Sequence, residues 1–287
     1  MFGFGKSECG GCVALEPETI ATVLRMTVAP TPARALIYDQ LIKDIKNTQG
    51  LCLGVSSLHQ RFLVLHIRAS HDKQASLLDW TNNVYDGTEI GTIRFTADRG
   101  VGGSVTGGNS YIQENYSQIQ DYFSPSSKFG GYITSDYNNR IIGYRTTTGG
   151  GGAAEMSLAR NLGNRIYDSW GTGRQFFQTA GAGMRETERG GTYFNGGFGG
   201  NRTLRYQGIE DLFVSPTTST FRFNFQLNFY SLGLNSAPNG GTFPVLGNPG
   251  EINTVGLMMF QFSGSRLIDS PRLLIAVEKY LSVIGAI

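Results

Sequence analysis

The sequence predicts a mainly β protein, an antiparallel two-sheet jelly-roll sandwich with flanking N-terminal helices and a C-terminal helix. Short runs rich in Thr, Tyr, Phe, Ile and Val recur between residues 82 and 264, separated by clusters of Gly, Asn and Ser, which is the composition of strands and turns. Within Thr220–Tyr230, apolar and polar side chains alternate, as in a half-buried antiparallel strand. No repeat of fixed period is present, which argues against a propeller or a β-helix.

The chain divides into three expected regions. Residues 1–30 contain two of the three Cys and only a short apolar piece, so we expect an extended N-terminal anchoring arm that becomes ordered against a partner. Residues 31–81 are expected to form a helical segment, and residues 82–287 the β-sandwich with the C-terminal helix.

The first helix is expected over residues 31–50. Thr31 can cap it, Pro32 stands where a missing N–H costs nothing, and Gly50 ends it. Its apolar residues recur every three or four positions along one face: Leu36, Ile37, Leu41, Ile42 and Ile45. Two further helices are predicted over Val55–Arg68 and Asp72–Leu78.

Strands and the last helix follow from similar signals. The clearest strands besides Thr220–Tyr230 are Glu89–Thr96, Arg140–Thr146, Arg174–Thr179 and Leu257–Phe262. Asn195–Gly196 is a strong signal for a tight turn. The C-terminal helix is expected to begin at Asp269 or Ser270 as cap, with Pro271 in the first turn, and to end at Gly285.

Composition disfavours several classes of protein. The 287 residues include 24 Lys and Arg against 22 Asp and Glu, a net charge of +2, with no run of five or more basic residues. We therefore expect no nucleic-acid partner, because nucleic-acid binders neutralise phosphates with basic patches. No apolar stretch reaches the roughly 18–20 residues that span a bilayer, and the first residues lack a secretory signal. We expect no membrane insertion and synthesis in a cytoplasm.

Two motifs near the N-terminus suggest cofactors only weakly. Cys9 and Cys12 have the spacing of half a zinc site or of a redox pair, but no further ligands lie near them in sequence and no βαβ pattern surrounds them. Disulfides within or between arms, and free thiols, stay open as alternatives. Gly5-Lys6-Ser7 ends like a phosphate-binding loop without the glycine that must precede it. We expect neither a metal nor another cofactor.

Two further patterns resemble catalytic arrangements. Glu186 and Glu188 would share one face of a strand, and glycoside hydrolysis requires paired carboxylates, but the Arg residues on both sides favour a solvated, charged strand end. His59, His66 and His71 lack a nucleophile at a catalytic spacing, and we interpret them as surface or partly buried helix residues. The sequence predicts no catalytic residue and a protein that is not an enzyme.

Aromatic side chains are the remaining candidates for ligand binding. Tyr85, Trp170, Tyr193 and Tyr206 lie beside turns rich in Gly, Asn and Asp, where their rings could stack on sugars. The alternative is that they belong to the sandwich core, which takes up most aromatic residues. These four residues are our candidate glycan contacts.

Several runs between about residues 31 and 285 occur in a recognisable order, of which Phe95–Gly100 (FTADRG) is the most distinctive. The others are Arg34–Ile37 with Leu41–Lys43, Lys73–Trp80, Tyr193–Gly196, Phe262–Gly264 and Tyr280–Gly285. In this order they resemble phage and prophage virion structural proteins that carry a concanavalin A-like (laminin G-like) jelly-roll domain after a helical segment.

The resemblance implies a virion protein: an outward-facing appendage, either capsid decoration or head fibre, or a neck or tail fibre, that binds host-surface glycans. Residues 1–30 lie outside the resembling runs, and our hypothesis is that they attach the chain to other virion proteins, with Phe2 and Phe4 as plug-like side chains and Cys9 and Cys12 as candidate cross-links. A homo-oligomer is expected, with a trimer favoured by analogy with other phage projections. A stand-alone lectin-like protein and, less favoured, a glycan-cleaving enzyme are the alternatives.

Overall fold

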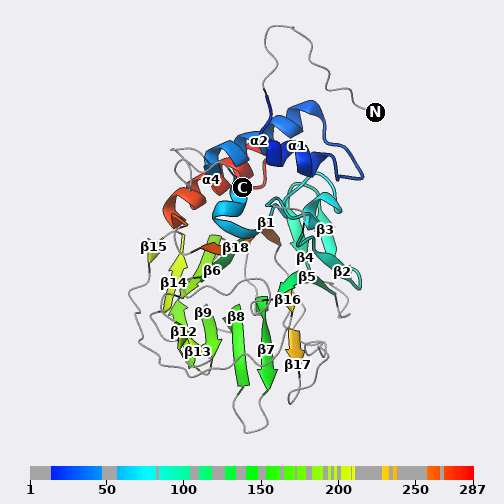
Figure 1. Ribbon diagram of the computed structural model, residues 1–287. Helices are drawn as coiled ribbons and strands as arrows, with labels where there is room; N and C mark the ends of the chain where they lie inside the picture. Colours follow the sequence, from blue (N-terminus) through cyan, green and yellow to red (C-terminus); the bar gives the residue numbers. More distant parts are fainter. Residues whose placement is uncertain are drawn as a thin grey trace.

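The computed structural model describes the chain in separate stretches. These are residues 14–46, 57–81, 84–103, 110–117, 127–133, 140–147, 153–161, 165–171, 173–178, 183–189, 193–194, 197–198, 202–207, 209–210, 228–232, 235–237, 257–265 and 268–287. Two eight-stranded sheets and a two-stranded hairpin make up the β structure. Helices lie over the first sheet, and strands of the second sheet lie beyond it (Figure 1).

The first sheet has the order β15-β14-β11-β6-β18-β4-β3, with β1 also paired to β18. Its strands are β1 (Phe62–His66), β3 (Arg94–Thr96), β4 (Gly100–Gly102), β6 (Ser127–Ile133), β11 (Gly183–Arg189), β14 (Arg202–Tyr206), β15 (Ile209–Glu210) and β18 (Met258–Ser265). The pairs around β18 are antiparallel, and they bring a strand near the C-terminus between strands from the first half of the chain.

The second sheet has the order β10-β9-β8-β7-β16-β5-β2, and β17 runs parallel to β7. Its strands are β2 (Thr88–Ile90), β5 (Tyr111–Ser117), β7 (Arg140–Thr147), β8 (Ala153–Asn161), β9 (Arg165–Gly171), β10 (Gly173–Gln178), β16 (Asn228–Ser231) and β17 (Asn235–Ala237). Strands β12 (Tyr193–Phe194) and β13 (Gly197–Phe198) form the separate hairpin.

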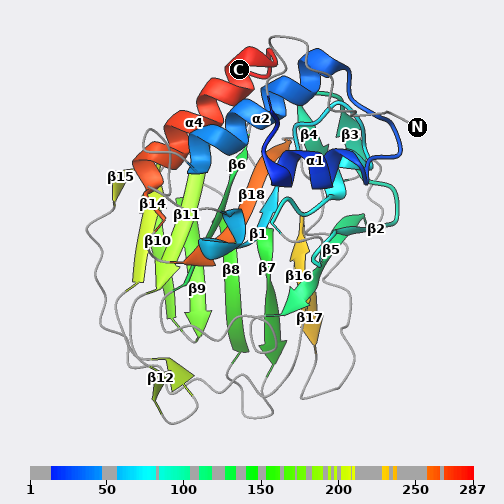
Figure 2. The same ribbon diagram turned by 45° about the horizontal axis from the view of Figure 1, so that its top comes forward.

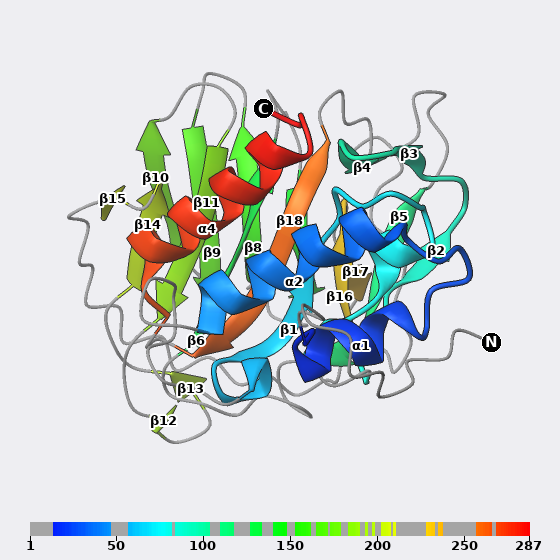
Figure 3. The ribbon, with the colours of Figure 1, turned by 90° about the horizontal axis from the view of Figure 1, so that it is seen from above.

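Three α-helices, α1 (Pro17–Val23), α2 (Pro32–Lys46) and α4 (Ser270–Val283), form a cap. Figures 2 and 3 show α2 and α4 side by side over the first sheet, with α1 on the other flank of α2. Both long helices begin as predicted: the Thr31 Oγ1 accepts from the Arg34 N–H at 3.2 Å, and the Asp269 carboxylate accepts from the Arg272 N–H at 3.2 Å.

One buried apolar cluster joins the cap to the first sheet. It includes Tyr38, Ile42, Leu65, Trp80, Phe260, Phe262, Leu273 and Val277. Burying a large apolar side chain stabilises the folded state by about 1.5–3 kcal/mol. The cluster therefore holds α2, near the N-terminus, and α4, near the C-terminus, on the same sheet.

Sequence and structure agree on the class of fold. A mainly β chain with antiparallel sheets, an N-terminal helix at α2 and a C-terminal helix at α4 is confirmed, and the arrangement is consistent with a β-sandwich. The strands predicted over Arg140–Thr146, Arg174–Thr179 and Leu257–Phe262 correspond to β7, β10 and β18. Jelly-roll strand order stays a prediction.

The helix predicted over Val55–Arg68 is wrong. Its second half forms β1, which is buried at every position and pairs with β18. A mainly apolar run suits a strand covered on both faces, and long-range pairing outweighed the weak helical periodicity. The helix predicted over Asp72–Leu78 is reduced to a 3₁₀ turn, η2 (Ala75–Leu77), and Asp72 still caps it.

Two other predictions are changed by the structure, and two more lie partly or wholly outside the described residues. The run Glu89–Thr96 divides into β2 and β3, on different sheets, at Gly91, whose φ is +71°. Residues 14–30, expected to be part of an extended arm, include α1 and a buried Met26. Of Thr220–Tyr230 only the last three residues are described, at the start of β16, and Asn195–Gly196 lies outside the described residues, between the paired β12 and β13.

Candidate functional site

The interior between α2, α4, β1, β18 and residues 95–100, which we call the helix–sheet seam, is built around Arg34. The Arg34 guanidinium lies 4.8 Å from the ring centre of Tyr38 and 5.7 Å from that of Tyr280. Its Nη2 donates to Asp98 Oδ1 at 2.5 Å and to the Tyr280 hydroxyl at 3.2 Å. The Tyr280 hydroxyl in turn donates to the Ala69 carbonyl at 2.6 Å. One cation therefore connects the first long helix, a turn and the last helix.

Burial changes the pKa values of the titratable groups in the helix–sheet seam. It raises the pKa of Tyr280 well above its ordinary value and raises that of Tyr38 as well. Burial by itself would lower the pKa of Arg34, but Tyr280, Tyr38 and Asp98 outweigh it and leave the pKa raised. In the stable state, therefore, Tyr38 and Tyr280 are neutral and the Arg34 guanidinium beside them is positively charged.

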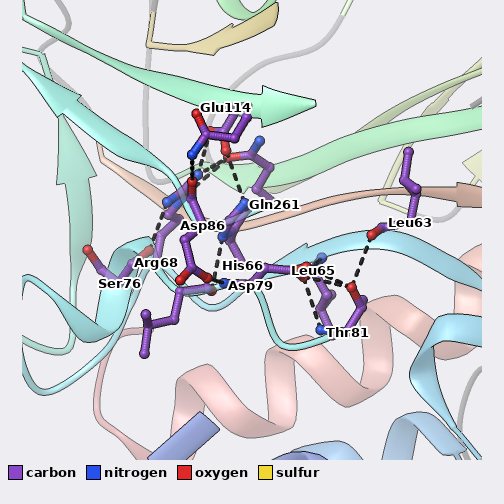
Figure 4. A network of polar contacts seen from close by, with 12 residues as sticks. Leu63, Leu65, His66, Arg68, Ser76, Asp79, Thr81, Asp86, Glu114 and Gln261 are labelled. Atoms are coloured by element: carbon purple, nitrogen blue, oxygen red, sulfur yellow. Dashed lines mark hydrogen bonds and ion pairs between the residues drawn. The ribbon is translucent and has the colours of Figure 1, made fainter. Parts of the chain in front are cut away.

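A second set of buried polar side chains lies where β1 meets β5 (Figure 4). Arg68 Nη2 is 2.6 Å from Glu114 Oε1 and 2.7 Å from Gln261 Oε1, and Arg68 Nη1 donates to the Ser76 carbonyl at 2.8 Å. His66 Nε2 lies 3.0 Å from Glu114 Oε2. Because His66, Arg68 and Glu114 are fully buried, this network links the two sheets and is closed to a substrate.

The same network reaches the N-terminal segment. The buried Asp79 carboxylate accepts from the Leu65 and Thr81 N–H groups at 3.2 and 3.0 Å. Its own N–H donates to Asp86 Oδ1 at 2.7 Å, and Asp86 forms an ion pair with Arg25 at 2.7 Å. Residues just after α1 are thereby fastened to the loops of the sandwich.

A third buried set corrects the interpretation of Glu186 as a solvated strand end. Glu186 on β11 is 1% exposed, and its Oε1 accepts from the Ser270 hydroxyl at 3.0 Å. Lys128 Nζ donates to Ser270 Oγ at 2.6 Å and to the Ile268 carbonyl at 2.8 Å, and lies 4.0 Å from Glu186. This group fixes the start of α4 on the sheet. The side chain of Glu188 lies outside the described part.

The outer surface of the cap contains an apolar groove between α2 and α4, with a volume of about 190 Å³. We call it the cap groove. Its walls include Leu36, Ile37, Leu41, Tyr280 and Val283, and Asp44 and Lys279 also line it, joined by an ion pair of 2.6 Å. Leu36 and Val283 are 45% and 59% exposed, so apolar surface faces solvent here.

The structure locates only some of the residues singled out from sequence. Tyr85 is 9% exposed, so it does not present the open ring expected of a sugar contact. The backbones of Trp170, Tyr193 and Tyr206 lie in β9, β12 and β14, and their side chains fall outside the described part. Phe2, Phe4, Cys9 and Cys12 also lie outside it, as does Cys52.

The histidines lie elsewhere than expected. None of the three is on an α-helix: His59 lies in a 3₁₀ turn, η1 (Leu58–Gln60), His66 in β1 and His71 in a bend. Sequence reasoning missed the buried roles of His66 and Arg68 because the helical interpretation treated His66 as a surface or partly buried helix residue and Arg68 only as the end of that helix. The available signal was two polar residues inside an otherwise apolar run.

Searches for metal sites and membrane spans cover the described residues alone. There, no three His, Cys, Asp or Glu side chains gather in a way that could hold a metal ion. No helix in the same stretches combines the length and apolar character needed to cross a bilayer.

The runs that carry the family resemblance converge on the helix–sheet seam. Arg34 pairs with Asp98, Arg99 donates to the Ala286 carbonyl at 2.6 Å, and the Trp80 ring lies 5.1 Å from that of Tyr38. Tyr280 and Phe262 belong to the same cluster. These separate runs, other than Tyr193–Gly196, therefore contribute residues to the same part of the structure, the helix–sheet seam.

No model of a known protein family matches the chain, and no curated protein matches it. Solved structures do match in fold. Trypanosoma rangeli sialidase in complex with sialic acid has a TM-score of 0.53 at 10% identity, over 89% of this chain and 39% of that one. The same sialidase with 2,3-difluoro-KDN gives 0.52 at 10% identity over 94% and 38%, and a mutant with trans-sialidase activity gives 0.50 at 8% over 87% and 39%. The chain thus spans under two fifths of these sialidases.

This likeness corrects one prediction. The sequence led us to expect a protein that is not an enzyme, but the solved structures that share its fold include sialidases. The prediction is withdrawn, because absence of a recognisable motif is no ground for excluding an enzyme from a fold that occurs in enzymes. At these identities the likeness is one of fold.

Proposed function

We propose that the chain is a structural protein of a phage virion, an outward-facing appendage that its N-terminal segment attaches to the particle. It serves as capsid decoration or head fibre, or as a neck or tail fibre. The observation that carries the proposal is the convergence of the resembling runs on the helix–sheet seam, centred on the Arg34–Asp98 pair. Resembling runs that contact one another in the structure support a fold shared with phage virion proteins better than runs scattered over the molecule would.

We further propose that the sandwich binds glycans on the host surface. The sialidases that share its fold include one in complex with sialic acid, which supports sugars as the class of ligand. Trp170, Tyr193 and Tyr206 remain the candidate contacts, and Tyr85 is removed from the set because it is buried. Binding to a glycan array, with Trp170→Ala as the variant, tests this part.

Attachment is tested by deleting residues 1–13 and leaving the packed residues 14–30 in place. The truncated protein is expected to keep its fold, with the same circular dichroism spectrum as the full chain, but to be absent from purified particles. Its retention on particles would overturn the role of the segment.

We also propose that the chain forms a homotrimer. Light scattering tests this oligomeric state, because the trimer would have three times the 31.2 kDa of one chain.

A glycan-cleaving enzyme is the second candidate, favoured by the sialidase fold. It predicts release of free sialic acid from a sialylated oligosaccharide by the purified chain. A stand-alone lectin is the third, and predicts glycan binding by a protein that is never found on particles.

A further inference from the structure

We propose that residues 1–13 of the chain fold back over α2 and place Phe2 and Phe4 in the cap groove of the same molecule. This inference concerns the isolated protein. It stands or fails independently of the virion proposal, because its test uses the purified chain alone.

The described chain begins beside the helix that forms one wall of the groove. Glu16 N–H donates to Asp39 Oδ1 at 2.5 Å, and Lys46 Nζ pairs with Glu16 and Glu18 at 2.7 and 2.9 Å. Lys43 Nζ donates to the Ala14 carbonyl at 3.4 Å. Residues 14–18 are thereby held along the flank of α2, and Figure 3 shows α1 on the side of α2 away from α4.

The segment of residues 1–13 is long enough to cross the helix. Ten residue steps separate Phe4 from Ala14, a reach of up to about 33–36 Å in an extended chain. The helix to be crossed is about 10–12 Å wide with its side chains. Phe2 and Phe4 alternate with glycine, and alternate residues of an extended segment project to the same side, so both rings can enter one groove.

Tethering favours this occupant over a free partner. The groove exposes Leu36 and Val283, and covering such apolar side chains removes them from water, which is favourable. A short flexible tether holds a segment near its site at an effective concentration in the millimolar range. The segment that is tethered to the other flank of α2 and carries two Phe is therefore the first candidate to fill the groove.

The experiment is nuclear magnetic resonance on the full chain with labelled Ile, Leu and Val methyl groups and protonated Phe rings. We expect cross-peaks between Phe rings and the Leu36, Ile37 and Val283 methyl groups, all lost in the double variant Phe2→Ser/Phe4→Ser. Val283→Arg, in the groove, should also abolish them. Ile275→Arg, on the same helix and 63% exposed but not in the groove lining, should leave them intact.

Two results would overturn the inference. One is the absence of these cross-peaks in the full chain. The other is their appearance in a mixture where one batch carries the protonated rings and the other the labelled methyl groups, because the segment would then occupy the groove of a second copy.

Discussion

Arg34 on α2 and Asp98 in the turn after β3 form an ion pair of 2.5 Å, although 64 positions separate them in the sequence. Asp98 has a φ of 60°, a left-handed conformation that Asp adopts more readily than most residues. Arg34 also contacts Tyr280 on α4. Each of the three residues lies in one of the runs on which the expected resemblance to phage virion proteins rests, and the proposed function depends on that expectation.

Removing Arg34 should destabilise the whole chain. Arg34→Ala loses the hydrogen bonds to Asp98 and Tyr280 and the contact with two rings, at a cost of about 2–3 kcal/mol in the free energy of unfolding. Arg34→Lys keeps the charge but not the planar fork, and should cost about 1 kcal/mol. Urea denaturation measures both. Equal stability of Arg34→Ala and the native chain would contradict this role.

Gly100 should tolerate no side chain. Its φ is +110°, and an added Cβ would lie 2.1 Å from the Met258 carbonyl oxygen of the neighbouring strand. Gly100→Ala is therefore expected to cost at least about 3 kcal/mol. Gly285 is the matched control: its φ is +71°, but an added Cβ meets no atom within 4 Å, so Gly285→Ala should cost about 1–2 kcal/mol. Similar losses for the two variants would show that the Met258 contact is unimportant.

The buried Lys128 and Glu186 should behave as a coupled pair. Glu186→Gln removes the carboxylate charge that faces Lys128 and is expected to cost about 3–5 kcal/mol. The double variant Lys128→Met/Glu186→Leu removes both charges and should recover most of that loss. Thermal unfolding of Lys128→Met, Glu186→Leu and the double variant measures the coupling, and a loss in the double variant equal to the sum of these two single losses would contradict it.

The chain should lose stability at alkaline pH. Burial raises the pKa of Tyr280 well above 10.0, so the unfolded chain loses this proton first as the pH rises. The unfolded state then binds fewer protons than the folded state, and the free energy of unfolding falls above pH 10. The raised pKa of Lys46, hydrogen-bonded to Glu16 and Glu18 against the opposing effect of burial, acts with the same sign.

Tyr280→Phe isolates one contribution to this alkaline loss. The variant should be less stable at neutral pH, because the hydroxyl no longer donates to Ala69, yet its stability should decline less between about pH 9 and 11.5. Urea titrations over that range provide the measurement. A decline as steep as that of the native chain would assign the loss to other groups.

Local signals were enough to predict the ends of the fold. Thr31 and Asp269 cap α2 and α4 as their sequence positions predict, and β7, β10 and β18 follow from composition. The sequence misled at β1, because the stretch before it shows weak helical periodicity and its partner, β18, lies about 200 positions away. Strand pairing between segments so far apart in the chain is not indicated by the local sequence pattern of either segment.

The polar interior was harder to anticipate than the fold. Nothing adjacent in sequence relates Arg68 to Glu114, or Lys128 to Glu186. Arg68 lies just after β1 and meets Glu114 on β5 of the other sheet, whereas Lys128 and Glu186 lie on the paired strands β6 and β11. Glu186 lies next to Arg185 in the sequence, which suggested a solvated strand end although its side chain is buried. The cap groove likewise arises from two helices at opposite ends of the chain.

The most direct test of the central claim is electron microscopy of phage particles from the producing culture, labelled with an antibody to this chain. The account predicts label on the particles, with label on the head or neck indicating decoration and label at tail tips indicating host recognition. Particles without label, while the protein is present in the same culture, would contradict the virion proposal and bring the enzyme and the lectin to the front.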